Sequence, residues 1–198
     1  MSDAFRSAVC AIALTLLVSG SAISPKVAAR QPEQGANPDA LATADFLKRV
    51  NAYLAIHLEA EKAAPKLPQE ATPQQIHQTQ RGMATRIQAA RAGTRRGDIF
   101  TPEMTAVVKR LMNRVFAGSD RWKLRSSIMD ENVKSIRLKA NQLYPNNVPL
   151  TSMPPDVLKA LPTLPEEMEY RFVGTHFILF DQHAHIIPDF IPDALPGK

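Results

Sequence analysis

The spacing of hydrophobic residues changes along this chain, and the change limits the folds open to it. Up to about residue 129, apolar side chains recur every three or four positions, which is the period of an amphipathic helix. From residue 166 to 191 they alternate or run continuously, which is typical of β-strands. The sequence therefore predicts an α+β protein, with an N-terminal bundle of three to four amphipathic helices and a small C-terminal antiparallel β-hairpin or meander.

Cap residues and prolines predict where the helices begin. Thr72-Pro73 and Thr101-Pro102 each place an N-cap residue before proline at the first helical position. The first helix is expected to begin at Asn37-Pro38 or Thr43 and to end near Ala64. Residues at helical spacing predict its apolar stripe: Leu47, Val50, Leu54 and Leu58, widened by Phe46 and Tyr53.

The C-terminal part predicts three strands. Gly174-Thr175 separates the first two, and glycine at the first position of a two-residue loop suits a type II′ turn. Residues 177–180 are apolar without alternation, so this strand should be central or covered on both faces. A third strand over 185–187 meets Pro188, which cannot donate to a ladder, and is therefore expected at a sheet edge.

These patterns divide the chain into five parts. They are a signal peptide over 1–29, a linker over 30–39, a helical region over 40–131, an extended proline-rich connection with a short helix over 132–165, and a β-hairpin or meander with a tail over 166–198. A fourth helix within the helical region is expected to be capped by Asp120.

An uncharged N-terminal segment predicts the protein's location. Residues 7–25 carry no charge, Arg6 precedes them, and small residues follow the apolar run, as in a secretory signal peptide. Cleavage after Ala22 or after Ala29 both fit, and either removes Cys10, the only cysteine. We expect a periplasmic or secreted, cysteine-free mature chain. The alternative is an N-terminal anchor in the inner membrane, since 19 uncharged residues reach the lower limit of about 17–25 that span a bilayer.

Charge is segregated along the chain. Residues 81–139 carry fourteen Lys and Arg against five Asp and Glu, whereas residues 154–198 carry three against seven. The favoured hypothesis is a non-enzymatic envelope module whose basic helical face meets an anionic envelope component, a peripheral membrane surface or a protein partner. The alternative is that the basic faces are solvated or lie against the acidic C-terminal part. Nucleic acid is not an expected partner, because few aromatic residues are interspersed in the basic stretch. The sequence does not predict an oligomeric state.

A D-x-H-x-H motif supplies the second functional hypothesis, which is metal handling. Asp181, His183 and His185 are spaced by two, and residues two apart on a strand share a face, so they could converge on a divalent transition metal. His176 lies nearby on the opposite parity. The alternative is a polar turn in which Asp181 caps backbone N–H groups and the imidazoles face solvent. No other cofactor is predicted.

The sequence offers little support for a catalytic function. The sequence contains no G-x-S-x-G elbow, H-E-x-x-H, P-loop or Rossmann fingerprint, so no catalytic residue is predicted and an enzyme is the less favoured class. His57 is expected at the edge of the core with one nitrogen satisfied, and His77 in solvent. A third hypothesis is a glycan-directed hydrolase, with a carboxylate pair drawn from the acidic cluster: Glu166, Glu167, Glu169 and Asp181.

The C-terminal block resembles a family of exported bacterial proteins of unassigned function. The resemblance rests on LPEEMEYRFVG at 164–174, the apolar strand to Phe180, Asp181, and DFIP at 189–192. Upstream, the segments RAG at 91–93, GDIFTPE at 97–103 and YP at 144–145 resemble the same family.

This resemblance implies a helical region followed by a small β element outside the cytoplasm, and no known activity. Two positions depart from the family pattern, which has an Asn-like residue in place of His185 and a β-branched residue in place of Pro188. The hairpin over 170–181 is also loosely similar to a short hairpin domain of periplasmic nickel/cobalt-homeostasis proteins.

Overall fold

The structure is a computed structural model that describes residues 37–118, 121–130 and 137–197. The signal peptide predicted over 1–29, most of the predicted linker and the predicted cap Asp120 lie outside these residues. Across the described ranges, none of the helices combines the length and the apolar character that crossing a membrane requires.

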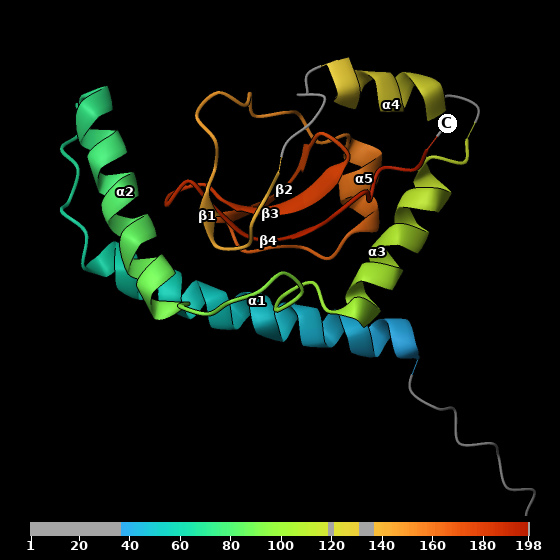
Figure 1. Ribbon diagram of the computed structural model, residues 1–198, viewed down its shortest axis with the longest axis horizontal. Coiled ribbons are helices and arrows are strands. Elements are labelled where there is room, and N and C mark those ends of the chain that lie inside the picture. The colour runs from blue at the N-terminus through green and yellow to red at the C-terminus, as the bar shows by residue number, and fades with distance from the viewer. Residues whose placement is uncertain (1–36, 119–120, 131–136, 198) are drawn as a thin grey trace, which may run out of the picture. The chain divides into compact units, whose positions relative to one another are not determined.

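Helices dominate the first two thirds of the described chain and strands the last third (Figure 1). The elements are α1 (Pro38–Lys62), α2 (Pro73–Ala90), α3 (Pro102–Val115), α4 (Arg121–Asp130), β1 (Gln142–Leu143), α5 (Pro155–Ala160), β2 (Met168–Val173), β3 (His176–Asp181) and β4 (Ile186–Ile191). The predicted α+β class is confirmed.

The first three helices begin where the cap residues predict. The Asn37 side chain accepts from the backbone N–H of Asp39. Thr72 and Gln75 form a complete capping box, in which each side chain accepts from the other residue's backbone N–H. The Thr101 hydroxyl accepts from the third helical N–H, and proline occupies the first turn of all three helices.

The four strands form one antiparallel sheet in the order β1-β4-β3-β2. In the β2–β3 hairpin, Val173 pairs with His176 across the two-residue loop, and Gly174 has φ of 60°. A positive φ at the first loop position is what the predicted glycine-first turn requires. The short strand β1 completes the sheet by pairing with the beginning of β4.

Strand β4 continues through Pro188 and lies between β3 and β1, so the predicted edge strand ending at Pro188 is wrong. The reason is a bulge. Asp181 pairs with Ile186 and Leu179 with Asp189, so one residue of β3 faces two of β4 between those pairs. Pro188 occupies the bulge, where its missing N–H costs no ladder bond.

Both faces of the sheet are covered, as the continuous apolar run predicts. One face packs on the helices, where Phe46 of α1 stacks at 6.4 Å on Tyr170 of β2. The other face is covered by the segment around Tyr144 and Val148. Helix α1 runs beneath the sheet, and α2 and α3 rise from its two ends (Figure 1). The sheet therefore shares a single core with all three helices.

The buried stripe of α1 differs from the predicted one. The helix buries residues spaced by three and four: Ala42, Phe46, Val50, Tyr53, His57 and Ala60. Leu58, predicted inside, is 45% exposed. The stripe is thus rotated toward the aromatic residues, and it places a histidine in the core.

Candidate metal centre

Helix α1 carries three polar side chains on successive turns of its last part. Tyr53, His57 and Glu61 are spaced by four residues, so they lie above one another on the same side of the helix. The first two are buried, and the third sits at the solvent end. The helix therefore leads from the core to the surface along a line of groups that can exchange hydrogen bonds or bind a cation.

A buried carboxylate at the end of β3 holds the inner two groups. The Tyr53 hydroxyl donates to Asp181 Oδ2 at 2.6 Å, and His57 Nδ1 lies 2.7 Å from the same oxygen. The backbone N–H of Ala184 donates to Oδ1 at 2.8 Å. Because the oxygen beside His57 is an acceptor, we place the imidazole hydrogen on Nδ1, which leaves the lone pair on Nε2.

Burial and the carboxylate shift the pKa values of both groups that contact Asp181. Burial and the neighbouring Asp181 carboxylate raise the pKa of Tyr53 far above its ordinary value. For His57, burial lowers the pKa, but the hydrogen bond to Asp181 and the negative charges of Asp181, Glu61 and Glu167 together outweigh burial, so the net pKa is raised. The guanidinium of Arg91 lies over the Tyr53 ring, 5.0 Å from its centre.

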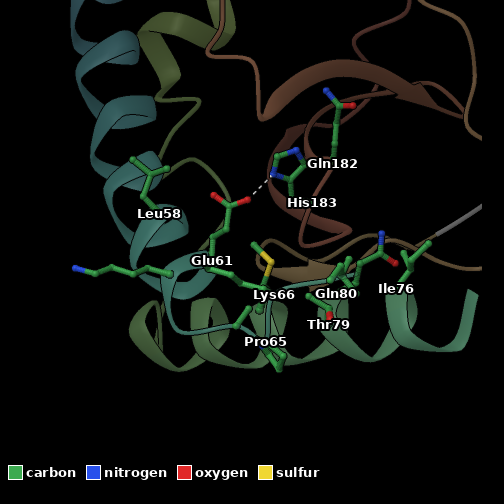
Figure 2. A pocket seen from close by; sticks show the side chains of 13 residues that line it. Leu58, Glu61, Pro65, Lys66, Ile76, Thr79, Gln80, Gln182 and His183 are labelled. Atoms are coloured by element: carbon green, nitrogen blue, oxygen red, sulfur yellow. Dashed lines mark hydrogen bonds and ion pairs between the residues drawn. The ribbon is translucent and has the colours of Figure 1, made fainter. Parts of the chain in front are cut away.

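The second nitrogen of His57 is the unsatisfied atom of the site. Nε2 is buried and has no hydrogen-bond partner among the described residues. Glu61 Oε2 lies 4.0 Å away, and Glu61 Oε1 lies 3.0 Å from His183 Nδ1. Figure 2 shows Glu61 reaching from α1 toward His183 on the β3–β4 turn. One ligating atom from each of the three residues lies within 4.8 Å of the other two.

These distances fit a divalent ion. Two atoms held at about 2.0–2.1 Å from one tetrahedral zinc ion are roughly 3.4 Å apart. Here 3.0 Å separates Glu61 Oε1 from His183 Nδ1, and 4.0 Å separates Glu61 Oε2 from His57 Nε2. Two imidazoles and a carboxylate are a ligand set used for zinc and its neighbours. A ligating histidine whose other nitrogen donates to a carboxylate is the usual outer-shell arrangement, and Asp181 supplies it here.

The D-x-H-x-H residues do not converge as the sequence hypothesis requires. Asp181 is buried and bonded to α1, while His183 is half exposed beside Glu61. His185 packs against the rings of Tyr144 and Phe180, both at 5.4 Å, on the opposite face of the sheet. Of those three residues, only His183 belongs to the cluster that could hold a metal ion; the other two members of that cluster are His57 and Glu61.

The polar-turn alternative is correct in one detail. Asp181 does cap a backbone N–H, that of Ala184, within the turn. His185 has φ of 52°, in the left-handed region that Asn adopts more readily than most residues.

The sequence contained a signal for two residues of the candidate cluster. His57 and Glu61 stand four apart on a helix, which is the spacing that brings two ligands to one face. The partner on the turn was not visible, because His183 contacts Glu61 from 122 positions away. His57 was expected at the core edge, and it is instead fully buried.

A second buried carboxylate has a different role. Asp189 accepts hydrogen bonds from the backbone N–H groups of Gly97, Ile99 and Phe100, at 2.8–3.1 Å, and from that of its own neighbour Phe190. Its acceptor capacity is filled by amides, so it fastens the loop before α3 to β4 and offers nothing to a ligand.

Comparisons with protein-family models, curated proteins and solved structures gave no match. The resemblance to a family of exported bacterial proteins stays a prediction.

Proposed function

We propose that this protein binds a divalent transition-metal ion through His57, Glu61 and His183. The observation that carries the proposal is the His57 ring: it is fully buried, Asp181 fixes its Nδ1, and its Nε2 faces Glu61 and His183 without a partner. A buried nitrogen left unpaired costs about 1–3 kcal/mol, and a bound cation removes that cost. The function is metal handling, with the metal between the first helix and the hairpin turn.

The donor set narrows the choice of ion. Imidazole and carboxylate ligands suit Zn²⁺, Ni²⁺, Co²⁺ and Cu²⁺, whereas sites for calcium or magnesium use oxygen atoms alone. The described residues near the cluster include no thiolate, so a site for Cu⁺ is not favoured. Zn²⁺ is the ion of first choice for the test, because it accepts a tetrahedral site with three protein ligands.

Isothermal titration of the purified protein with Zn²⁺ and Ni²⁺ tests the proposal. We expect one ion per chain. His183→Ala and Glu61→Gln each remove one exposed ligand, so neither should disturb the core, and each should weaken the affinity at least tenfold. His77→Ala is the matched control, because His77 is an exposed histidine outside the cluster. Absence of heat, or an affinity that both ligand variants leave unchanged, would refute the site.

The location of this activity also stays a proposal. The predicted signal peptide over residues 1–29 would place the site in the periplasm or outside the cell, where the chain would meet metal ions after export. The alternative anchor would hold it at the inner membrane. The predicted bundle of three to four helices is likewise a proposal. In it, α1 carries two of the three proposed ligands, His57 and Glu61.

Two other hypotheses from the sequence are not advanced further. An anionic envelope partner for the basic helical region stays a prediction that no contact in the described residues tests. A hydrolase would need two facing carboxylates, but the carboxylate of Asp181 is bonded inside the core and Glu169 pairs with Arg171. Binding of a divalent metal ion is therefore the function that the geometry favours.

A further inference from the structure

The candidate metal site opens into a pocket of about 790 Å³. Glu61 and His183 both line this pocket, whereas the His57 side chain is fully buried behind them. The walls come from the end of α1, the segment that connects it to α2, the first half of α2 and the β3–β4 turn (Figure 2). With three protein ligands, a tetrahedral ion keeps one coordination position free. Because His57 closes the inner side, the free position faces the pocket.

The pocket walls hold an unusual share of the exposed apolar side chains. Eight large hydrophobic side chains are exposed among the described residues, and three of them line this one pocket. They are Leu58, Leu67 and Ile76, with exposed fractions of 45%, 42% and 39%. Scattered exposed leucines need no explanation, but a group of them beside a site marks a ligand-binding surface.

The charges around the pocket select the head group of the ligand. Lys62 and Lys66 line it, and Glu61 is the only acidic residue among the described residues of its lining. A bound divalent ion would add two positive charges and share the Glu61 carboxylate. The pocket would then attract an anion, and a carboxylate is an ordinary fourth ligand for such an ion.

We propose that the pocket takes a small monocarboxylic acid with an aliphatic chain, its carboxylate on the free metal position beside Lys62 and Lys66 and its chain along Leu58 and Ile76. This inference rests on the proposed function, since the carboxylate needs the metal. It goes further by naming the class of ligand that the metal site takes. Charge alone would favour any anion, and the apolar wall adds the preference for a chain.

Co²⁺ provides the test, because its visible absorption changes when a ligand joins or leaves its coordination shell. The protein is loaded with Co²⁺ and titrated with acetate and with octanoate, which has six more methylene groups. Each methylene that becomes fully buried strengthens binding about fourfold. Burial of even half the chain would therefore favour octanoate over acetate by at least tenfold. The metal-free protein should show no comparable preference.

Two leucines of the same helix give matched variants. Leu58→Gln changes the pocket wall and should reduce the preference for octanoate to less than threefold. Leu41→Gln changes a leucine that is 57% exposed, seventeen residues earlier on α1 and outside the pocket, and should leave the preference intact. Both variants should still bind Co²⁺, because neither removes a ligand.

The outcomes separate this inference from the proposed function. A protein that takes up no metal refutes the metal site itself. A Co²⁺-loaded protein that binds octanoate no more tightly than acetate overturns the ligand inference and leaves the metal site standing. The inference is also overturned if octanoate binds the metal-free protein equally well, or if Leu58→Gln has no more effect than Leu41→Gln.

Discussion

Replacing Tyr53 with Phe tests whether the buried carboxylate network holds the structure together. The change removes one O–H group that donates to Asp181 at 2.6 Å and keeps the aromatic ring. The contact of Arg91 with the ring face, at 5.0 Å, remains available to phenylalanine. The loss is therefore confined to one hydrogen bond to a carboxylate, which contributes about 1.5–3 kcal/mol to the free energy of unfolding.

Urea denaturation followed by circular dichroism measures this loss. For a slope of about 2 kcal/mol per molar urea, the transition midpoint of Tyr53→Phe should fall by roughly 0.8–1.5 M. Tyr170→Phe is the matched control. Tyr170 is also buried in the same core, but its hydroxyl donates to the neutral carbonyl of Pro162 at 3.1 Å. A neutral hydrogen bond contributes only about 0.5–1.5 kcal/mol, so this midpoint should fall by less.

The comparison between the two variants decides the prediction. If Tyr53→Phe shifts the midpoint no more than Tyr170→Phe does, at equal slopes, Asp181 does not act as a charged acceptor, and the imidazole hydrogen of His57 has no reason to lie on Nδ1. Metal affinity gives a second readout. Tyr53→Phe leaves the contact between His57 and Asp181 in place, so Zn²⁺ affinity should change by less than tenfold.

Two further predictions concern the loop before α3. Asp189→Asn would put amide hydrogens opposite backbone N–H donors, so the free energy of unfolding measured in urea should fall by roughly 2–4 kcal/mol. The Zn²⁺ affinity per folded chain should stay unchanged. A variant that lost metal binding without losing stability would contradict the separate roles of Asp189 and Asp181. Gly97→Ala should cost roughly 1–2 kcal/mol in thermal denaturation, because Gly97 has φ of 94° although a Cβ there meets nothing closer than 3.7 Å. Gly118→Ala, where a Cβ meets nothing within 4 Å and φ is ordinary, should not destabilise the protein, and equal losses in the two variants would show that backbone strain is not the cause.

The helix starts were predictable because their causes are local. A threonine cap, the proline after it and the glutamine that completes the capping box lie within four residues of one another, so the sequence alone displays the whole interaction at Thr72. The α+β class was predictable for a similar reason, since hydrophobic period is a property of short windows.

The buried face of α1 was not predictable, because its cause is distant. Leu54 and Leu58 form as regular a stripe as the observed one, and hydrophobicity alone favours them. The observed stripe instead contains His57, which is buried because Asp181 lies 124 positions later in the chain and satisfies one of its nitrogens. Sequence periodicity cannot show such a partner.

The error at Pro188 has a comparable origin. Proline in a strand argues for an edge unless a bulge removes the need for its N–H, and the bulge depends on the register of β4 against β3. The sequence hypothesis of a metal site and the cluster proposed from the structure have one residue in common, His183. His57 and Glu61 carried the helical spacing of a ligand pair, but the residue that completes the cluster comes from the hairpin turn.

The separation between Asp181 and its two donors has a consequence for how the chain acquires its structure. Tyr53 and His57 leave the ribosome 128 and 124 residues before the carboxylate that they require. A nascent chain that ends before the hairpin would have to bury two unpaired polar groups or keep α1 undocked. We therefore expect the helices to consolidate only with the last segment, in a single late and cooperative step dominated by non-local contacts.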